Sequence, residues 1–316
     1  MKNFAILGRW HVHARDYARQ ISELPGCRIS KVWDPDEENA KAWAESLGCE
    51  AAGMEDILND PSIEGVIICT ASSEHPSILI RACQSGKAVF TEKVLTLSTK
   101  DAEEVRKAVL ANNIRFAISF PHHCDPATLF ALEAVRSGKL GEINYARVRK
   151  SHNGSLADWL PPHFYDPEAC GGGAMIDLGA HPMYLLCALL GEPVSVRSTF
   201  TKVTGRAVED NAVSLLEFAN GAIGVSETGF VSTNFPLTIE LGGTKGGLLA
   251  RNDKVSWCCE ATGNQWVDVE QLPERASLPI AQWAFAEKPE DIAPEFGIDA
   301  AVRLTRVMEA AYKEYK

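Results

Sequence analysis

Four side chains with acid–base character stand where a folded chain could bring them to one site. Glu92 and Lys93 directly follow the short apolar run 88–91, and Asp177 and His181 follow three consecutive glycines. Asp177 and His181 are four residues apart, so in a helix they share a face and the carboxylate can set the tautomer and basicity of the imidazole. Ammonium, carboxylate and imidazole together could carry general acid–base chemistry, although each feature alone also fits a solvated surface.

A second group of residues has the pattern of a phosphate-binding turn. The apolar run 4–7 ends at Gly8, directly before a predicted helix, where backbone N–H groups and the helix dipole can bind a pyrophosphate. The further glycines that normally complete this turn are missing, because the chain continues Arg-Trp-His-Val-His. We therefore expect pyrophosphate contacts from the side chains of Arg9, Trp10 and His11.

Asp34 stands at the end of the next apolar run, 28–33, and is followed by proline. In a dinucleotide-binding domain, an acidic side chain at this place accepts hydrogen bonds from the ribose hydroxyls and repels a 2′-phosphate. Asp-Pro is also a common turn at the end of a strand, so both interpretations stay open. If Asp34 binds a ribose, NAD is favoured over NADP, because no cation follows in residues 35–38.

The first third of the chain alternates between two periods. Short apolar runs predict strands at 4–7, 28–33, 65–69, 88–91 and 114–119, and helical spacing follows at 12–22, 36–47, 75–85 and 99–112. This alternation predicts parallel strands with helices on both faces, so the runs are apolar throughout. The fold class is therefore α/β, with a doubly wound Rossmann domain over residues 1–120 whose ligands lie at the carboxyl ends of the strands.

After Pro121 the pattern changes to that of an α+β domain. Helical spacing covers 126–137 and the stretch from Gly173 to Leu190, and strands are predicted at 143–149, 212–218, 222–228, 237–241, 247–249 and 254–258. Asn220-Gly221 between two of these runs is a strong hairpin signal. We expect a mainly antiparallel open sheet with helices on one side and a closing amphipathic helix within 294–315, so that residues 121–316 form a second domain.

Composition excludes several classes of protein. The 31 basic and 42 acidic residues give a formal net charge of −11, which opposes binding to a nucleic acid backbone. No apolar run approaches the ~20 residues of a membrane-spanning helix, so no membrane partner is expected. The nine cysteines are odd in number and show no Cys-x-x-Cys spacing, which is typical of reduced thiols in a cytoplasmic protein.

The eight histidines all fall in predicted loops or at helix starts near the expected ligand site. Neutral imidazole is a common zinc ligand, so a metal site would explain this clustering. Histidine also suits polar and phosphate-bearing ligands at neutral pH. The sequence shows no tight set of two histidines and a carboxylate beyond His11-x-His13 itself, and we therefore expect no metal.

Several motifs in a fixed order resemble those of the Gfo/Idh/MocA oxidoreductases, the family of glucose-fructose oxidoreductase and inositol dehydrogenase. They are Thr70 with His75, Ser-Gly-Lys-Ala-Val at 85–89, Glu92-Lys93, and Gly-Gly-Gly-x-x-x-Asp-x-Gly-x-His over 171–181. The resemblance covers nearly the whole chain. It implies a nucleotide-binding domain followed by a substrate domain that commonly dimerises face to face.

The resemblance also implies roles for individual residues. The catalytic group would be Lys93, Asp177 and His181, and the cofactor would be lined by Gly8, Asp34, Thr70, His75, Glu92 and Lys93. The chain departs from the family pattern in its shorter glycine loop, if His13 takes the place of the family's histidine. It also has Val94 where the family has proline, and Phe-Pro-His-His at 120–123 where the family often has an Asn/Arg pair.

The expected function is an NAD(P)-dependent oxidoreductase acting on a CH–OH group of a polyhydroxylated small molecule, such as a sugar, a polyol or a sugar acid. His181 would take the hydroxyl proton, Lys93 would stabilise the alkoxide, and Asp177 would orient the imidazole. Side chains common in sugar-binding sites gather before residue 166, and the expected substrate contacts are His122, His152, Asn153, Trp159, His163 and Tyr165.

Two alternatives use the same scaffold. One is an NAD-dependent glycosidase that returns the hydride, and the other is a non-catalytic regulatory protein that senses a nucleotide. The retained Lys93, Asp177 and His181 argue against the second alternative. We also expect a homodimer or homotetramer, because an open sheet face that carries Val213 and Leu215 is seldom left to water.

Overall fold

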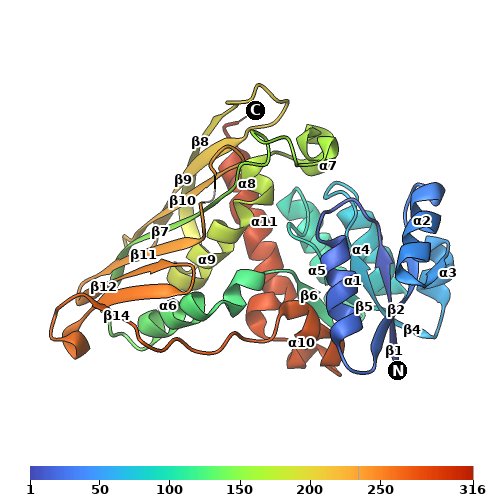
Figure 1. Ribbon diagram of the computed structural model, residues 1–316, viewed down its shortest axis with the longest axis horizontal. Helices are drawn as coiled ribbons and strands as arrows, with labels where there is room; N and C mark the ends of the chain where they lie inside the picture. Colours follow the sequence, from blue (N-terminus) through green and yellow to red (C-terminus); the bar gives the residue numbers. More distant parts are fainter. Residues whose placement is uncertain (234, 316) are drawn as a thin grey trace. The chain divides into compact units, whose positions relative to one another are not determined.

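The chain folds into two compact units. The computed structural model describes residues 1–233 and 235–315 (Figure 1). The first unit contains Met1–Ser119 and Ser277–Thr305, and the second contains Phe120–Ala276 and the chain from Arg306 onward. The first unit's N-terminal part ends at Ser119. The second domain, expected as the continuous range 121–316, differs from this expectation because residues 277–305 return to the first unit.

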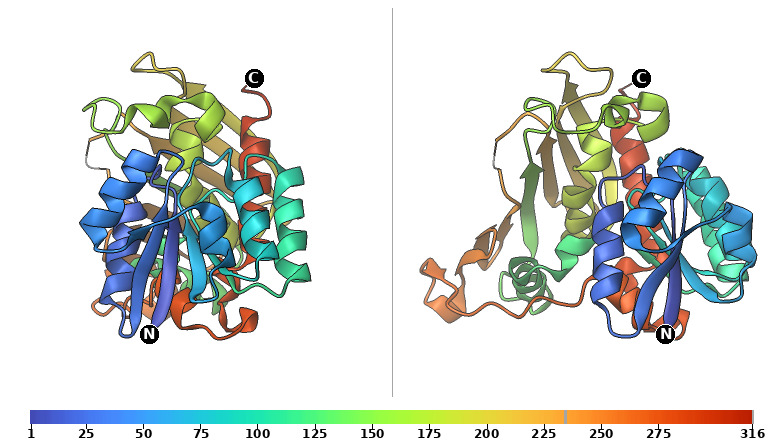
Figure 2. Two further views of the ribbon diagram at one scale, coloured as in Figure 1. Left: turned by 90° about the vertical axis from the view of Figure 1, so that its right-hand side faces the viewer. Right: turned by 45° about the vertical axis from the view of Figure 1, so that its right-hand side comes forward.

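The first unit is built on a six-stranded sheet in which every neighbouring pair is parallel. The strand order is β3-β2-β1-β4-β5-β6, with bounds β1 (Lys2–Leu7), β2 (Cys27–Trp33), β3 (Glu50–Ala51), β4 (Ile63–Ile68), β5 (Ala88–Thr91) and β6 (Phe116–Ile118). Helices lie on both faces (Figure 2): α1 (Ala14–Glu23), α2 (Glu37–Leu47), α3 (Met54–Asn59), α4 (His75–Gln84) and α5 (Thr99–Ala111). This order confirms the doubly wound Rossmann fold.

Local sequence explains these elements. Nearly every residue of β4 and every residue of β5 is buried, because helices cover both faces of the sheet. Asp36 caps α2, since its Oδ1 accepts hydrogen bonds from the N–H groups of Glu38 at 2.9 Å and Asn39 at 3.1 Å. Gly48 ends the same helix in the left-handed conformation.

The strand order sets the place of the ligand site. From β1 and β4 the sheet extends in opposite directions, and ligands of such sheets bind at the carboxyl ends beside this switch point. Gly8 follows β1, Thr70 lies just beyond β4, and Lys93 lies just beyond β5. All three residues therefore stand at one edge of the sheet.

A returning segment of the chain packs into the first unit, and its largest buried side chain is Trp283. Helix α10 (Pro279–Phe285) contacts α1 and β6, and Trp283 within it is 0% exposed. The indole centroid lies 4.9 Å from the ring of Phe4 and 5.7 Å from the ring of Phe90, and its N–H donates to the Arg115 carbonyl at 3.2 Å. Burial of this indole against strands far away in sequence is the physical reason for the corrected domain boundary.

We expect Trp283→Ala to lower the free energy of unfolding by about 3–5 kcal/mol, because it opens a cavity against Phe4 and Phe90. Trp266→Ala is the matched control, since that indole is 53% exposed and its loss should change stability by less than about 1 kcal/mol. Urea denaturation of both variants gives the comparison. Equal losses would contradict the role assigned to Trp283.

The second unit is built on an eight-stranded mixed sheet. The strand order is β14-β13-β12-β11-β7-β10-β9-β8, with bounds β7 (Ile143–Ser151), β8 (Pro193–Thr201), β9 (Asn211–Phe218), β10 (Ile223–Gly229), β11 (Thr238–Gly243), β12 (Gly246–Arg251), β13 (Lys254–Cys258) and β14 (Val267–Asp268). Only the pair β7–β10 is parallel among these neighbours. The expected mainly antiparallel sheet is confirmed, and Gly221 at φ +84 makes the predicted hairpin between β9 and β10.

Helices cover one face of this sheet (Figure 1). Helix α9 (Ala180–Leu190) contacts β7 and β10, while α6 (Pro126–Arg136) contacts β12. Exposed and buried residues alternate along the whole of β9, as a sheet with one covered face requires. The shorter elements are η1 (Pro121–Cys124), η2 (Pro162–Tyr165), α7 (Pro167–Cys170), α8 (Ala174–Asp177), η3 (Glu260–Thr262), η4 (Pro289–Asp291) and η5 (Pro294–Phe296), and α11 (Ile298–Tyr312) is the expected closing helix.

The helix expected from Gly173 to Leu190 is divided between α8 and α9. Leu178 and Gly179 connect the two and keep right-handed helical dihedral angles, so the chain bends here rather than reversing. Within the described residues no single helix is long and apolar enough to cross a membrane. One pair of helices joined at a bend, Pro167–Asp177 and Ala180–Leu190, is long and apolar enough only when the two are taken together. The cysteines form no disulfide within the described residues.

Candidate active site

Gly8 allows the turn after β1 to approach β4 closely. Its φ is +85, and a Cβ at this position would lie 2.5 Å from Thr70 Cγ2 and 2.9 Å from the Thr70 backbone. The Gly8 N–H donates to the Trp33 carbonyl at 2.8 Å, and the His11 N–H donates to the Cys69 carbonyl at 3.0 Å. The turn is therefore fixed to the ends of both neighbouring strands, although it lacks the further glycines of the usual pattern.

The Asp34 carboxylate is fixed at the end of β2. Its Oδ2 accepts a hydrogen bond from the Arg9 N–H at 2.9 Å, and its Oδ1 accepts one from the Asp36 N–H at 3.1 Å. The side chain is half-buried, and a carboxylate has further lone pairs beyond these two bonds. Asp34 thus presents acceptors to the carboxyl edge of the sheet, where a ribose would lie.

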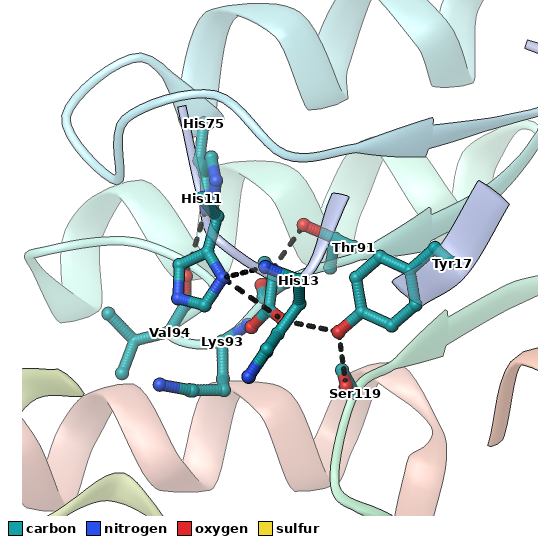
Figure 3. Close-up of polar contacts among 9 residues, drawn as sticks. His11, His13, Tyr17, His75, Thr91, Lys93, Val94 and Ser119 are labelled. Carbon is teal, nitrogen blue, oxygen red and sulfur yellow. Dashed lines mark hydrogen bonds and ion pairs between the residues drawn. The ribbon is translucent and has the colours of Figure 1, made fainter. Parts of the chain in front are cut away.

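Glu92 is the centre of a buried polar cluster, and its partners His11, His13, Tyr17 and Lys93 are labelled in Figure 3. Its side chain is 1% exposed, and its Oε1 lies 2.7 Å from His13 Nδ1 and 3.5 Å from His11 Nδ1. The Tyr17 hydroxyl donates a short hydrogen bond to the same oxygen. The other carboxylate oxygen accepts the Lys93 backbone N–H at 2.8 Å, so the cluster also fixes the residue that the sequence marks as catalytic.

Charge keeps Glu92 ionised despite its burial. Burial alone would raise the pKa of this carboxyl, but the neighbouring His11 and His13 imidazoles and Lys93 outweigh it and hold the pKa well below its usual range. Burial, followed by the charge of Glu92, raises the pKa of Tyr17 well above its ordinary value. Tyr17 therefore stays protonated and donates to the carboxylate.

Two buried polar atoms near this cluster fit a ligand. Thr70 Oγ1 is buried and has no hydrogen-bond partner among the described residues. His75 Nδ1 lies 2.9 Å from the Val94 carbonyl and 3.2 Å from that of Leu95, which assigns the ring proton to Nδ1, and its buried Nε2 likewise has no described partner. Burial lowers the pKa of His75, with partial compensation from these carbonyls, so the ring is neutral. Unsatisfied acceptors beside Gly8 are what a dinucleotide with hydroxyl and amide groups would complete.

In the second unit, η1 brings a second imidazole next to His181. The rings of His122 and His181 meet edge to face with centroids 4.7 Å apart, and Tyr184 Oη lies 3.2 Å from His181 Nδ1. His122 Nδ1 lies 2.5 Å from Asp125 Oδ2, and Arg275 pairs with the other oxygen of Asp125 at 2.6 Å. Burial lowers the pKa of His122 more than Asp125 raises it, so this imidazole is neutral near pH 7.

The glycines before Asp177 pack against protein within the second unit. A Cβ on Gly172 would lie 2.3 Å from Tyr312 Oη, and one on Gly173 would lie 2.0 Å from the Glu209 carbonyl oxygen. The fully buried Glu209 carboxylate accepts the N–H groups of Gly173 and Met175 at 3.0 Å and the Tyr312 hydroxyl at 2.5 Å. Close packing in their own unit thus explains Gly172 and Gly173, whereas Gly171, at φ +79, ends α7 in the left-handed conformation.

Apart from His122, the residues expected to contact substrate lie between β7 and α7. His152, Asn153 and Trp159 lie together, because the Trp159 N–H donates to Asn153 Oδ1 at 3.2 Å and the rings of His152 and Trp159 are 4.7 Å apart. Tyr165 is buried, with Ser155 Oγ 3.2 Å from its hydroxyl. His163 is half-buried and its ring lies 5.2 Å from that of Phe164.

The structure divides the expected catalytic residues between the two units. Lys93 belongs to the first, together with the expected cofactor residues Gly8, Arg9, Trp10, His11, Asp34, Thr70, His75 and Glu92, and Asp177 and His181 belong to the second, together with His122. Sequence reasoning missed four residues that hold these groups: Tyr17, Asp125, Tyr184 and Glu209. A spacing signal existed for two of them, since Asp125 and Tyr184 lie three residues after His122 and His181. The partners of Tyr17 and Glu209 are distant in sequence.

A parallel doubly wound sheet in the first unit, and paired imidazoles on η1 and α9 in the second, define a two-domain, NAD-dependent oxidoreductase. The chain belongs to the Gfo/Idh/MocA family. Residues 2–120 match its oxidoreductase family, NAD-binding Rossmann fold, and residues 129–249 match the GFO/IDH/MocA C-terminal domain. The family resemblance and the NAD cofactor inferred from the sequence are thereby confirmed.

Similar proteins cover most of the chain. Inositol 2-dehydrogenase of Rhizobium meliloti is 29% identical over 271 residues, which cover 83% of this chain and 79% of that protein. The scyllo-inositol 2-dehydrogenase (NAD(+)) of Bacillus subtilis is 28% identical over 253 residues, covering 77% and 72%. The crystal structure of aldose-aldose oxidoreductase from Caulobacter crescentus, complexed with glycerol, has the same fold, with a TM-score of 0.83 at 20% identity over 99% of this chain and 96% of that chain.

Asp34 should set the preference for NADH over NADPH. We expect wild type to bind NADH more than tenfold more tightly, because the Asp34 carboxylate repels a 2′-phosphate. Asp34→Ala should reduce the ratio of NADH affinity to NADPH affinity, chiefly by weakening NADH binding. Glu38→Gln removes an exposed charge nearby and should leave the ratio unchanged. Calorimetric titration with both nucleotides tests this, and equal affinity of wild type for the two would contradict it.

The buried histidines should make the protein acid-sensitive. Burial lowers the pKa of His123 from its ordinary 6.5 to about 4, so the unfolded chain binds a proton before the folded one does. Stability should therefore be full above pH ~6.5 and fall as pH drops toward 4, with about 3 kcal/mol lost through His123 alone. His123→Gln should flatten the slope of unfolding free energy against pH in this window, whatever its stability at pH 8. Parallel slopes for wild type and variant would contradict this assignment.

Proposed function

We propose that this protein oxidises one CH–OH group of a polyol or sugar, passing the hydride to NAD. The observation that carries the proposal is that relatives named for action on inositols align across both domains, so the substrate-binding half is shared as well as the cofactor-binding half. The geometry agrees with it, because His122 and His181 gather beside Tyr184 in the second domain and hydroxyl-rich substrates suit such groups.

NAD, when bound, supplies the hydride acceptor. His181 is the proposed base for the hydroxyl proton, and an Nδ1–H bond to Tyr184 would assign that task to Nε2. Lys93, fixed at its backbone by Glu92, would stabilise the developing alkoxide. Asp177, at the end of α8, would orient substrate and imidazole. His122, with Asp125 behind it, would hold a second substrate hydroxyl.

A panel of inositols, aldoses, other polyols and sugar acids, each assayed with NAD for the growth of nicotinamide absorbance, tests the substrate class. Net reduction of NAD by at least one polyol or sugar is the expected result. If a glycoside added to the panel is hydrolysed to a free sugar without net reduction of NAD, the result would instead support a hydrolase that takes up the hydride and returns it. Tight NADH binding with no turnover on any member would contradict the proposal.

Replacing the proposed catalytic groups should affect turnover far more than NADH affinity. His181→Asn removes the base and Lys93→Met removes the ammonium, and each should lower kcat on the order of 10²-fold or more. Lys100→Met, an exposed lysine at the start of α5, is the matched control and should turn over like wild type. Turnover of His181→Asn and Lys93→Met within fivefold of wild type would contradict these roles.

The uncovered face of the second unit's sheet supports association between copies. Leu215 on β9 is 51% exposed, and Val213 beside it and Ile223 on β10 are also exposed. Arg147 on the same sheet forms ion pairs with Glu227 at 2.8 Å and Glu240 at 3.4 Å. A broad face with apolar residues and internally neutralised charges is a suitable surface for a symmetric sheet-to-sheet contact.

We therefore expect light scattering at micromolar concentration to give a multiple of the 34.4 kDa chain mass, as a dimer or tetramer. Leu215→Lys should shift the mass toward that of one chain, because a buried unpaired charge opposes association. Leu110→Lys, at an exposed site on α5, is the control and should leave the mass unchanged. A wild-type mass of one chain would contradict the expectation.

A further inference from the structure

The sequence alone predicts no metal, but the fold adds a carboxylate to His11-x-His13, and we propose that His11, His13 and Glu92 bind one divalent transition-metal ion. Each residue offers one ligand atom, and the three atoms all lie within 4.8 Å of one another. The sequence supplies the two histidines as His-x-His in the turn after β1, while the fold brings in Glu92 from the end of β5. Two imidazoles and one carboxylate are a ligand set found in catalytic zinc and non-haem iron sites.

The distances between ligand atoms fit a single ion. Metal–nitrogen and metal–oxygen bonds of about 2.0–2.2 Å in tetrahedral geometry place neighbouring ligand atoms about 3.3 Å apart. Glu92 Oε1 lies 2.7 Å from His13 Nδ1 and 3.5 Å from His11 Nδ1, and these two distances lie on either side of the expected separation. The two imidazole centroids are 4.6 Å apart with the rings inclined by 58°, so small side-chain rotations would direct both Nδ1 atoms at one ion.

The surroundings of Glu92 support a ligand role. Glu92 is buried and Tyr17 donates to the same Oε1, which orients the carboxylate as hydrogen-bond partners of metal ligands do. Tyr17 Oη in turn lies 2.7 Å from Ser119 Oγ. The second oxygen accepts the Lys93 N–H, which directs Oε1 toward the histidines. The carboxylate is thus fixed from both sides before any ion binds.

The donor atoms also indicate the class of metal. Mixed nitrogen and oxygen ligands suit Zn²⁺, Co²⁺, Ni²⁺ or Fe²⁺, whereas Mg²⁺ and Ca²⁺ prefer oxygen ligands. The His13 side chain is 37% exposed, so solvent can reach the ion as a further ligand. An ion here would link the turn after β1 to the end of β5 and add positive charge to a turn that lacks the usual glycines. The inference does not depend on the proposed substrate.

Metal binding can be measured without cofactor or substrate. Tag-free, chelator-treated protein is titrated with Zn²⁺ by calorimetry, and bound metal is counted by mass spectrometry after gel filtration. We expect one equivalent in wild type, unaffected by millimolar Mg²⁺. His13→Gln, at the most exposed of the three ligands, and His11→Gln should each weaken binding on the order of 10²-fold. His163→Gln is the matched control and should bind like wild type.

Co²⁺ in place of Zn²⁺ identifies the ligands by absorption. The expected spectrum has visible d–d bands and no thiolate-to-cobalt charge-transfer band, because the nine free cysteines are not ligands of this site. Tyr17→Phe should weaken binding about 10-fold while the spectrum keeps the same donor type, as loss of a supporting hydrogen bond predicts. The proposal would be overturned if wild type bound no stoichiometric metal. It would also be overturned if His11→Gln and His13→Gln bound metal as tightly as wild type, or if the cobalt spectrum showed thiolate ligands.

Discussion

The buried carboxylate of Glu92 is the interaction on which the candidate site of the first unit depends. A buried charge is costly unless it is paired and hydrogen-bonded, and Glu92 meets this demand with partners from the segment 11–17 and from the backbone of the next residue. His11 and His13 come from the turn after β1, Tyr17 from α1, and the Lys93 N–H from its own strand end. Loss of the carboxylate would release the turn, the helix start and the backbone of Lys93 together.

In the second unit, the carboxylate of Glu209 holds the backbone near the expected catalytic residues in a similar way. It too is fully buried, and it binds backbone N–H groups at Gly173 and Met175 as well as the Tyr312 hydroxyl. Burial raises the pKa of Glu209, which the hydrogen bonds only partly offset, whereas the cationic neighbours of Glu92 lower the pKa of that residue. One carboxylate thus positions the segment before Asp177 and His181 by hydrogen bonds to N–H groups, and the other positions Lys93 within a charged cluster.

The two sites differ in how they use histidine. In the second unit, burial keeps the imidazoles of His122 and His123 neutral, and Asp125 and Tyr184 fix the rings of His122 and His181 at their Nδ1 atoms. Neutral, oriented imidazoles suit proton transfer. In the first unit, the histidines instead surround a carboxylate at a place where the usual turn has glycine. This arrangement suits the binding of a metal ion more than proton transfer.

The sequence by itself determined the local elements and the motif residues. Alternating periods placed five strands of the first sheet and its main helices, Asn220-Gly221 fixed the hairpin, and the motifs marked Lys93, Asp177 and His181. These features follow from side-chain periodicity and turn chemistry, which act over a few residues. Strand β8 was missed because half-exposed polar residues interrupt its apolar pattern, and β3 and β14 because they have only two residues each.

Only the tertiary structure decided which distant residues meet. The return of α10 to the first unit depends on Trp283 entering a space between Phe4 and Phe90, and no local pattern around residue 283 carries that information. Sequence patterns also could not predict the tyrosine partners of the two buried carboxylates, because these partners are distant in sequence. Tyr17 lies 75 residues from Glu92, and Tyr312 lies 103 residues from Glu209. Burial and charge pairing are properties of the folded surroundings, so a residue's type shows what it can do, and the fold determines what it contacts.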